Sequence, residues 1–320
     1  MEDKPGSNEK YSNGCIHSVT LRNFGCFQEE VFFFGPHLNL IQGPSMSGKT
    51  TILEGINLAF GASPSCFGRG KQFAEFIRDG CSRARVSVVM SAGAGKQTEI
   101  SILIREPNVR YFIDRKETEI VEIKAFRDHY FIRVDCPFFF SNETSIQRLS
   151  DQSPTELFCS VMQAICAEQY PGEYPLFWSI IVQTLVQQAN GDFNQSLSLL
   201  GGEGQLRCVL EDMRGFYVLG INLRASLSSE TPAQLLKDMS YENKCVMIKL
   251  LILAFQQYDI FPFWCLDDCF DESTPIFNAI MEKFRSSGSQ MFVVTSREPR
   301  FMDRTGVRYV RTEEVLEQCE

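Results

Sequence analysis

Hydrophobic and polar residues alternate along several stretches of the first third of the chain, and this period of two predicts β-strands. Residues 16–21 and 30–34 flank a turn, and residues 84–90, 99–105 and 109–114 show strand patterns as well. Because short turns separate consecutive stretches, we expect an antiparallel sheet at one side of an N-terminal lobe.

The remainder of the chain mixes helical spacing with short, continuous hydrophobic runs. The runs at residues 38–42, 261–266 and 291–295 are typical of buried strands, and residues 214–229 also favour strands. Hydrophobic residues at helical spacing predict helices over residues 51–60, 119–131, 151–167, 176–188, 240–257 and 274–284. This mixture of strands and helices indicates an α/β fold.

One predicted helix carries a start signal. Ser153 can cap its first turn, Pro154 suits the first helical position, and Glu156 stands three residues after the cap. This is the capping-box pattern, in which the two side chains satisfy each other's backbone N–H groups.

A phosphate-binding loop lies between a predicted strand and a predicted helix. It reads Gly43-Pro44-Ser45-Met46-Ser47-Gly48-Lys49-Thr50. Glycines let backbone N–H groups wrap a phosphate, Lys49 can reach the β- and γ-phosphates, and the Thr50 hydroxyl can hold Mg²⁺. The alternative is a chance glycine-rich turn, but the strand before it and the helix after it favour a phosphate site at a helix N-terminus.

A second acidic motif suits the same chemistry. The hydrophobic run ending Phe263-Trp264-Cys265-Leu266 leads directly into Asp267 and Asp268. In a phosphate-loop enzyme, a carboxylate after a buried strand holds the Mg²⁺ shell and a second one can orient the attacking water. We assign Asp267 to magnesium and Asp268 to the water. The alternative is an acidic turn after a core strand.

Composition adds constraints. The 31 Lys and Arg against 40 Asp and Glu give a net charge of −9, so the chain as a whole is not a polycation for nucleic acid. Arg78, Arg83 and Arg85 nevertheless lie close together in sequence, as a solvated face or a local basic patch. The 12 cysteines form no CxxC pair, which argues against zinc, and no run approaches a membrane span. We expect reduced cysteines inside the cell and no membrane partner.

Several of these motifs, in this order, resemble one family. Residues 21–24, the phosphate loop and residues 53–56 resemble the N-terminal head lobe of SMC (structural maintenance of chromosomes) proteins. Other segments are similar to the sixth eukaryotic paralogue of that family, which pairs with the fifth in a DNA-repair complex. These segments are residues 69–70, 76–82, 84–88, 131–137 and 263–268.

The resemblance implies an ABC-type P-loop ATPase head built from two lobes on a shared core sheet. It implies ATP and Mg²⁺ as cofactors, a fifth-type SMC head as heterodimer partner, and a role in chromosome maintenance, DNA recombination or DNA repair in the nucleus. It also implies sequence-independent DNA contact through surface arginines. The arginines in question are Arg69, Arg78, Arg83 and Arg85.

The chain departs from the SMC pattern at the signature loop. The family places its signature serine 27 residues before the metal-binding aspartate, which here is Ser240 (267 − 240). Tyr241 and Glu242 replace the glycines that would allow close approach to a phosphate. The string Leu200-Gly201-Gly202-Glu203 resembles a signature but stands too far from Asp267, so we expect it to be a loop.

Two further departures concern a glutamine and the coiled coil. Asn142 is the nearest match to the family's glutamine that senses Mg²⁺ and γ-phosphate. No sustained heptads occupy residues 165–205, so a head without arms and hinge is expected.

We expect four segments. These are a disordered leader at residues 1–14, an N-terminal head lobe with the phosphate loop at 15–167, a connecting segment at 168–213, and a C-terminal head lobe at 214–320. The C-terminal lobe carries the degenerate signature and the acidic (Walker B) strand. Weak or partner-dependent ATP hydrolysis is the leading hypothesis. A non-catalytic interaction module is the alternative, and a degenerating paralogue with no retained role is a third.

Overall fold

The computed structural model describes residues 10–67, 72–165, 176–210, 218–228, 230–256, 261–267, 276–285, 288–295 and 305–312. The chain divides into two compact units. The first contains residues 1–135, 139–142 and 261–320, and the second contains residues 136–138 and 143–260. Each unit therefore combines segments that are distant in sequence.

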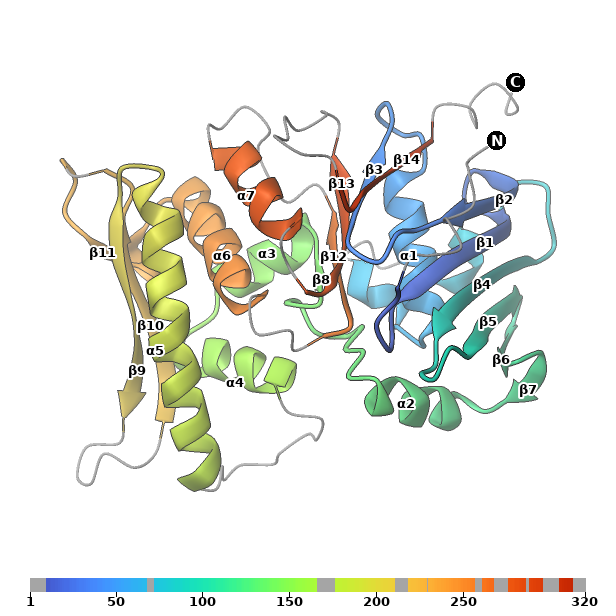
Figure 1. Ribbon diagram of the computed structural model, residues 1–320, viewed down its shortest axis with the longest axis horizontal. Coiled ribbons are helices and arrows are strands. Elements are labelled where there is room, and N and C mark those ends of the chain that lie inside the picture. The colour runs from blue at the N-terminus through green and yellow to red at the C-terminus, as the bar shows by residue number, and fades with distance from the viewer. Residues whose placement is uncertain are drawn as a thin grey trace. The chain divides into compact units, whose positions relative to one another are not determined.

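A six-stranded antiparallel sheet forms one part of the first unit (Figure 1). Its strand order is β2-β1-β4-β5-β6-β7. The strands are β1 (Ile16–Phe24), β2 (Phe27–Phe33), β4 (Ala84–Ser91), β5 (Gln97–Arg105), β6 (Asn108–Ile113) and β7 (Lys116–Thr118). Burial alternates along β4, so one face of the sheet packs inward and the other is more exposed. The expected antiparallel sheet is confirmed.

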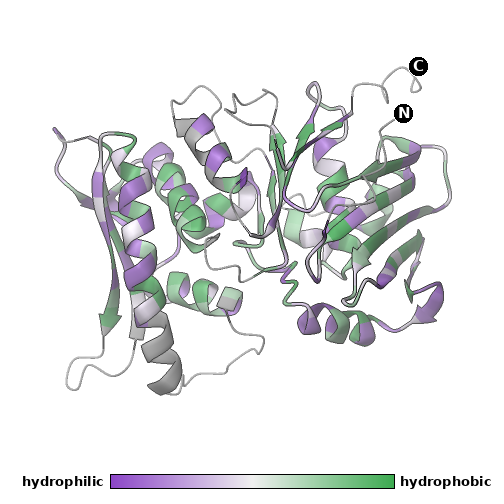
Figure 2. Ribbon diagram, viewed as in Figure 1, coloured by the Kyte–Doolittle hydropathy of each residue, from purple (hydrophilic) through white to green (hydrophobic). Residues whose placement is uncertain are grey.

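A five-stranded parallel sheet forms the other part of this unit, in the order β14-β3-β13-β12-β8. Its strands are β3 (Leu38–Gln42), β8 (Phe140–Ser141), β12 (Phe263–Asp267), β13 (Gln290–Thr295) and β14 (Val307–Arg311). Helix α7 (Ile276–Arg285) connects β12 to β13. Strands from both ends of the chain thus share one sheet, which confirms the expected shared core. Figure 2 shows its central strands as largely hydrophobic, as expected for a sheet covered on both faces.

Helix α1 (Lys49–Ala59) packs against both sheets, contacting β1, β4 and β5 of one and β12 and β13 of the other. Every residue from Ile52 to Ala59 is buried, because neither side of the helix faces water. A Cβ on Gly55 would lie 2.9 Å from Leu21 Cδ2, so glycine permits the close approach of helix and strand.

Two buried amides tie the sheets together. The Gln290 side chain accepts from the Ile16 N–H and donates to the carbonyls of Ile16 and Gly35, each at 2.7 Å. The Asn39 amide accepts from Gly35 N–H at 2.7 Å and donates to the Gly35 carbonyl at 3.0 Å. Both side chains are fully buried. These bonds satisfy backbone groups at the start of β1 and in the β2–β3 connection, which would otherwise be buried without partners.

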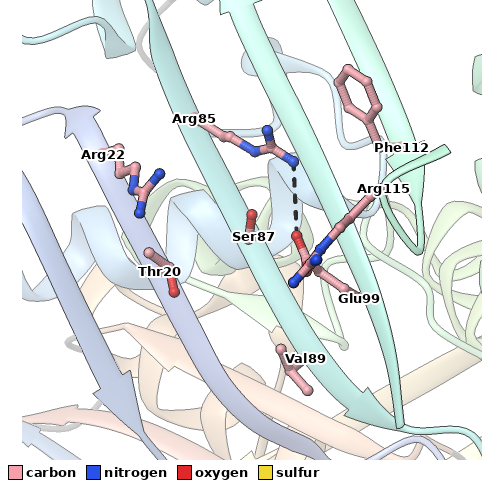
Figure 3. Close-up of a pocket in the computed structure, with 8 residues that line it drawn as sticks. All are labelled: Thr20, Arg22, Arg85, Ser87, Val89, Glu99, Phe112 and Arg115. Atoms are coloured by element: carbon pink, nitrogen blue, oxygen red, sulfur yellow. Dashed lines mark ion pairs between the residues drawn. The ribbon is translucent and has the colours of Figure 1, made fainter. Parts of the chain in front are cut away.

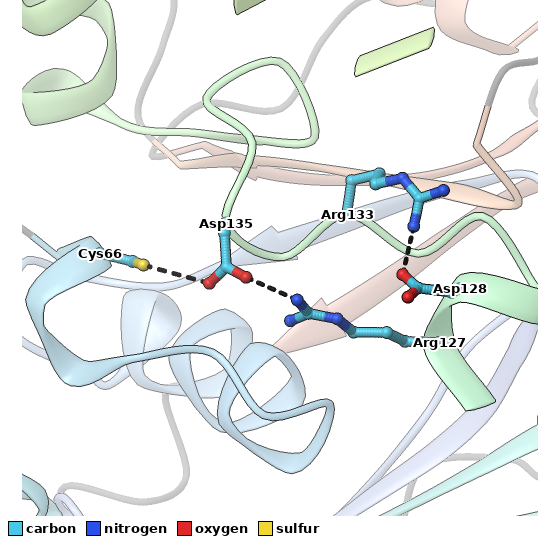
Figure 4. Close-up of polar contacts among 5 residues, drawn as sticks. All are labelled: Cys66, Arg127, Asp128, Arg133 and Asp135. Carbon is cyan, nitrogen blue, oxygen red and sulfur yellow. Dashed lines mark hydrogen bonds and ion pairs between the residues drawn. The ribbon is translucent and has the colours of Figure 1, made fainter. Parts of the chain in front are cut away.

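Ion pairs hold the segment after helix α2 (Ile120–His129) in place (Figure 4). Arg127 Nη2 donates to Asp135 Oδ2 at 2.7 Å, and Arg133 Nη1 donates to Asp128 Oδ1 at 2.6 Å. The Cys66 thiol, from the short 3₁₀ helix Pro64–Phe67, also contacts the Asp135 carboxylate, at 3.6 Å. Both arginine side chains are largely buried, so loss of either carboxylate would leave a desolvated charge.

The second unit places helices against a small antiparallel sheet of order β11-β10-β9. The strands are β9 (Glu203–Leu210), β10 (Val218–Ser226) and β11 (Gln234–Leu235). The helices are α3 (Glu143–Ser150), α4 (Pro154–Ile165), α5 (Leu176–Ser198) and α6 (Tyr241–Gln256). Helix α5 packs on β9 and on α6, while α4 packs on β10 and α3 on α6.

The capping box is confirmed at the start of α4. Glu156 accepts a hydrogen bond from the Ser153 N–H at 2.8 Å, and Ser153 Oγ accepts one from the Glu156 N–H at 3.4 Å. The Ser153 N–H and the Ser153 hydroxyl both donate to the Glu156 carboxylate, each at 2.8 Å, and these two bonds lower the pKa of Glu156.

The segment expected to connect the lobes is more ordered than its composition indicated. Helix α5 continues to Ser198 rather than ending near residue 188, and β9 follows it. The string Leu200 to Glu203 forms the turn between them, where Gly201 takes a φ of +78° and Gly202 N–H donates to Leu197 O. The expectation of a loop at this string is therefore confirmed. The leader proposed at residues 1–14 lies mostly outside the described residues.

Gln290→Ala should lower the free energy of unfolding by about 3–5 kcal/mol, because it removes the side-chain partner of the buried Ile16 N–H and carbonyl and one of the two amides that donate to the Gly35 carbonyl. Urea denaturation followed by tryptophan fluorescence measures the loss. The matched control is Gln97→Ala, an exposed glutamine, with a change within about 0.5 kcal/mol. If both variants lowered the free energy of unfolding equally, the buried Gln290 amide would contribute no more to stability than an exposed glutamine.

Candidate functional site

The phosphate loop follows β3 and leads into α1, as the sequence predicts. Gly48 is the N-cap of α1 with a φ of +89°, and the Ile52 N–H donates to the Gly48 carbonyl at 3.2 Å. Pro44, Ser45 and Met46 are exposed at the loop tip, whereas Ser47 is buried. The loop therefore leads directly into a helix N-terminus, a position that favours an anion.

Both glycines of the motif are required by close contacts. A Cβ on Gly43 would lie 2.0 Å from Thr312 Oγ1 and 2.6 Å from Ser47 Oγ. A Cβ on Gly48 would lie 2.5 Å from Cys26 Sγ, and its positive φ also disfavours any other residue. The backbone can approach its neighbours closely only because these side chains are missing.

Lys49 folds back over its own loop. Its ammonium donates to the carbonyls of Gly43 at 2.8 Å and Pro44 at 2.6 Å. The positive charge therefore lies directly beside the loop backbone, where the sequence pattern places a phosphate.

The structure brings Thr50 and Asp267 together although they are 217 residues apart: the Thr50 hydroxyl donates to Asp267 Oδ1 at 3.0 Å. Because β3 and β12 are parallel strands of one sheet, their carboxyl ends meet at one edge. Asp267 is only 7% exposed. Burial strongly raises the pKa of the neighbouring Cys265 thiol, so this residue stays neutral.

Asn142 lies at the same edge. Strand β8 pairs in parallel with β12, with Ser141 opposite Leu266. The residue after Ser141 is Asn142, and the residue after Leu266 is Asp267. Asn142 is 9% exposed. Thr50, at the start of α1, thus contacts Asp267 at the end of β12, and Asn142 follows the strand next to β12.

Sequence reasoning missed one contributor to the loop, Thr312. This fully buried residue follows β14, and its side chain hydrogen-bonds Ser47 Oγ and the Gln42 carbonyl, while its N–H also donates to Gln42 O at 3.0 Å. The alternation in residues 307–311 is the signal that could have predicted β14. No local pattern marks a threonine 265 residues away as a support for the loop.

Ser240 belongs to the second unit and precedes α6. Its hydroxyl accepts from the Asn243 N–H at 3.4 Å and its carbonyl accepts from Lys244 N–H at 2.9 Å, so it caps the helix. Ser240, Tyr241 and Glu242 are all exposed. Ser240 lies in the second unit, whereas the phosphate loop belongs to the first.

The remaining expected residues differ in how far the structure describes them. Asp268 and Arg69 lie outside the described residues. Arg83 is exposed and Arg78 is partly exposed, as contact with the backbone of DNA would require. Arg85 is instead engaged on the sheet, where its guanidinium donates to Ser101 Oγ at 3.1 Å.

These features define a P-loop ATPase head of the ABC type: a phosphate loop between β3 and α1, and an acidic strand end beside it in the same parallel sheet. Comparison with protein families supports this class, since residues 18–184 match the family described as AAA domain. The chain belongs to this family as a head of the SMC kind, most like the sixth paralogue.

Two curated relatives show the SMC similarity. The chain is 30% identical over 168 residues to structural maintenance of chromosomes protein 5 of Caenorhabditis elegans, covering 52% of this chain and 16% of that protein. It is 26% identical over 202 residues to structural maintenance of chromosomes protein 6 of Schizosaccharomyces pombe, covering 58% and 17%. The chain therefore matches about one sixth of the length of these relatives.

A solved structure shows the same fold. The crystal structure of an Smc head bound to the C-terminal winged-helix domain of ScpA superposes with a TM-score of 0.75. The match covers 88% of this chain and 90% of the Smc head at 17% identity. Among the described residues, no helix is both long and apolar enough to cross a bilayer.

Thr312→Val should loosen the phosphate loop, because it removes the hydroxyl that bonds Ser47 and the Gln42 carbonyl. We expect a loss of about 1–2 kcal/mol in stability. Faster amide hydrogen exchange within residues 43–48 is expected too. Thr312→Ser keeps the hydroxyl and is the matched control. Unchanged exchange in the valine variant would exclude a supporting role for this side chain.

Proposed function

We propose that the chain binds ATP with Mg²⁺ and works as one head of a pair of SMC heads. The observation that carries this proposal is the convergence of the phosphate loop and Asp267, made through the 3.0 Å bond between Thr50 and Asp267. A hydroxyl and a carboxylate oxygen side by side are the hard oxygen ligands that Mg²⁺ prefers. The residues present therefore fit the ion.

Each residue has a role in this proposal. The backbone of residues 43–48 would bind the phosphates, and the Lys49 ammonium would exchange its loop carbonyls for phosphate oxygens. Thr50 and Asp267 would hold Mg²⁺. Asn142, at the end of β8, would take the place of the glutamine that senses the metal and the γ-phosphate. Asp268 would orient the attacking water.

The start of α6 supports an asymmetric pair. ABC-type heads complete each other's ATP site with the N-terminus of the signature helix, and here Tyr241 and Glu242 occupy that position. Tyr241 is 48% exposed, and in this role its ring would obstruct an approaching phosphate and the Glu242 carboxylate would repel it. The site on this chain could be completed by a partner head with an intact signature. The partner's own ATP would be poorly completed.

The biological setting follows from the relatives. Both curated relatives are named for structural maintenance of chromosomes. We propose action on chromosomes in the nucleus, in DNA repair or recombination, with a fifth-type SMC head as partner. Arg78 and Arg83 would contact the backbone of duplex DNA without sequence preference. Any gel shift with duplex DNA should therefore weaken steeply as the salt concentration rises. A shift that does not depend on salt would exclude this DNA contact.

One observation favours a second function. The exposed Tyr241 and Glu242 at the start of α6 give this helix a surface unsuited to phosphate, and a non-catalytic interaction module would use it for docking a protein partner. ATP would then only stabilise the head. If Asp268→Asn impaired function as severely as Lys49→Ala, this alternative would fail.

Calorimetry should show micromolar binding of Mg-ATP to the wild-type chain. Lys49→Ala should weaken it at least about tenfold, since a charge-assisted hydrogen bond contributes about 1.5–3 kcal/mol. Lys96→Ala, at an exposed lysine outside the loop, is the matched control. Thr50→Ala should reduce the gain in affinity that Mg²⁺ gives over EDTA. Absence of binding by the wild type would refute the nucleotide site.

Hydrolysis should be slow for the chain alone and rise when a fifth-type SMC head is added, because the partner's signature completes the site. Lys49→Ala should abolish the contribution of this chain. Replacing Tyr241 and Glu242 by glycine should raise turnover at the partner's site. Fast turnover by the isolated chain, unaffected by Lys49→Ala, would sink the proposal of a paired head.

A further inference from the structure

A polar hollow lies on the exposed face of the antiparallel sheet (Figure 3). The opposite face carries buried residues such as Leu21 and Val86. The hollow has a volume of about 430 Å³ and draws its lining from β1, β4, β5, β6 and the turn after β6. Its polar lining consists of Thr20, Arg22, Arg85, Ser87, Glu99 and Arg115, which we call the sheet-face hollow.

The sheet-face hollow breaks a rule of strand pairing. The register places Arg22 directly opposite Arg85 on neighbouring strands. Like charges directly opposite each other destabilise a strand pair, so a bound anion would be favourable here. Glu29 pairs with Arg22 at 2.7 Å at the rim, where both side chains are more than half exposed and the pair contributes little.

Arg85 is held in place before any ligand arrives. Its Nη2 donates to Ser101 Oγ at 3.1 Å, and its guanidinium lies 5.2 Å from the centre of the Phe112 ring. Ser101 is fully buried and anchors the side chain. A guanidinium has five N–H donors, so this hydrogen bond leaves capacity for another acceptor.

Glu99 is the acidic residue in the lining of the hollow, and its ion pairs with two arginines are long. Its carboxylate lies 3.8 Å from Arg85 and 3.7 Å from Arg115, beyond hydrogen-bond length in both pairs. Asp114, at the margin, accepts the Glu99 N–H at 2.9 Å. The residues that line the hollow carry a charge of +2 (3 − 1), and the rim carboxylates of Glu29 and Asp114 offset it.

We propose that the sheet-face hollow binds a phosphate monoester, as carried by a phosphorylated serine or threonine side chain or by a small phosphorylated molecule. A monoester has nearly two negative charges and three terminal oxygens at neutral pH, which match the +2 charge of the lining residues and their several arginine donors. Thr20 and Ser87 add hydroxyl donors, while Phe112 and Val89 form apolar walls. A phosphodiester has one charge and continues on both sides, which suits an open groove instead.

Isothermal titration calorimetry with a neutral pentapeptide containing one phosphothreonine tests the site. We expect the wild-type chain to bind the phosphorylated peptide and not to bind the same peptide without the phosphate. Arg85→Gln should weaken binding at least about tenfold. Arg105→Gln, at an exposed arginine of the same sheet outside the hollow, should leave it unchanged. Glu99→Gln removes the competing anion and should tighten binding about three- to tenfold.

The Glu99→Gln arm keeps the test decisive even if Arg85→Gln fails to fold, because a damaged protein does not gain affinity. Binding should persist in Lys49→Ala, which separates this site from the phosphate loop; loss there would overturn the proposal. If inorganic phosphate bound as tightly as the peptide, the site would be supported and its ligand would be a small phosphorylated molecule. Equal competition by a short DNA duplex, or no effect of Glu99→Gln, would overturn it.

Discussion

Thr50 and Asp267 meet because β3 and β12 run parallel on either side of β13. Parallel strands bring their carboxyl ends to one edge of a sheet, and ligands of α/β proteins bind at such edges. The register of β13 with both neighbours therefore decides whether a hydroxyl from the start of α1 and a carboxylate from the other end of the chain share one position. Asn142 joins them through the two-residue strand β8. The loop chemistry would be ineffective if this register shifted by one residue, since every side chain would then face the other side of the sheet.

Much of this arrangement could be predicted from local patterns. The phosphate loop is recognisable because its chemistry needs particular residues at fixed spacing, and the strand ending at Asp267 is a continuous hydrophobic run. The capping box at Ser153 is equally local. Strand β14, strand β8 and the partners of Gln290 were not predicted. These features depend on residues more than a hundred positions apart, and a short strand such as Phe140–Ser141 has too few residues to show a period. Thr312 is buried against the loop only because β14 lies next to β3, which no window of sequence reveals.

The head combines an intact phosphate loop with a start of α6 that carries Tyr241 and Glu242 where the SMC resemblance implies glycines. These two features lie in different units. A Cβ on Gly43 or Gly48 would clash with neighbouring side chains, so substitution there would damage the fold as well as the site. Tyr241 and Glu242 are exposed at a helix start, where substitution affects little besides a partner. Packing thus restricts substitution in the phosphate loop, whereas the start of α6 tolerates it.

The two buried amides have a consequence for how the chain folds. Gln290 bonds residues of β1 and the β2–β3 connection across 274 and 255 positions, and Asn39 bonds Met291 across 252. Contacts of such long sequence separation form slowly, because a large loop must close before they add any stability. During synthesis, β3 leaves the ribosome long before β13 exists, so its edges remain unpaired for most of translation. An unpaired hydrophobic strand in this position is a site of aggregation. The first unit should therefore depend on protection by chaperones until its final strands emerge.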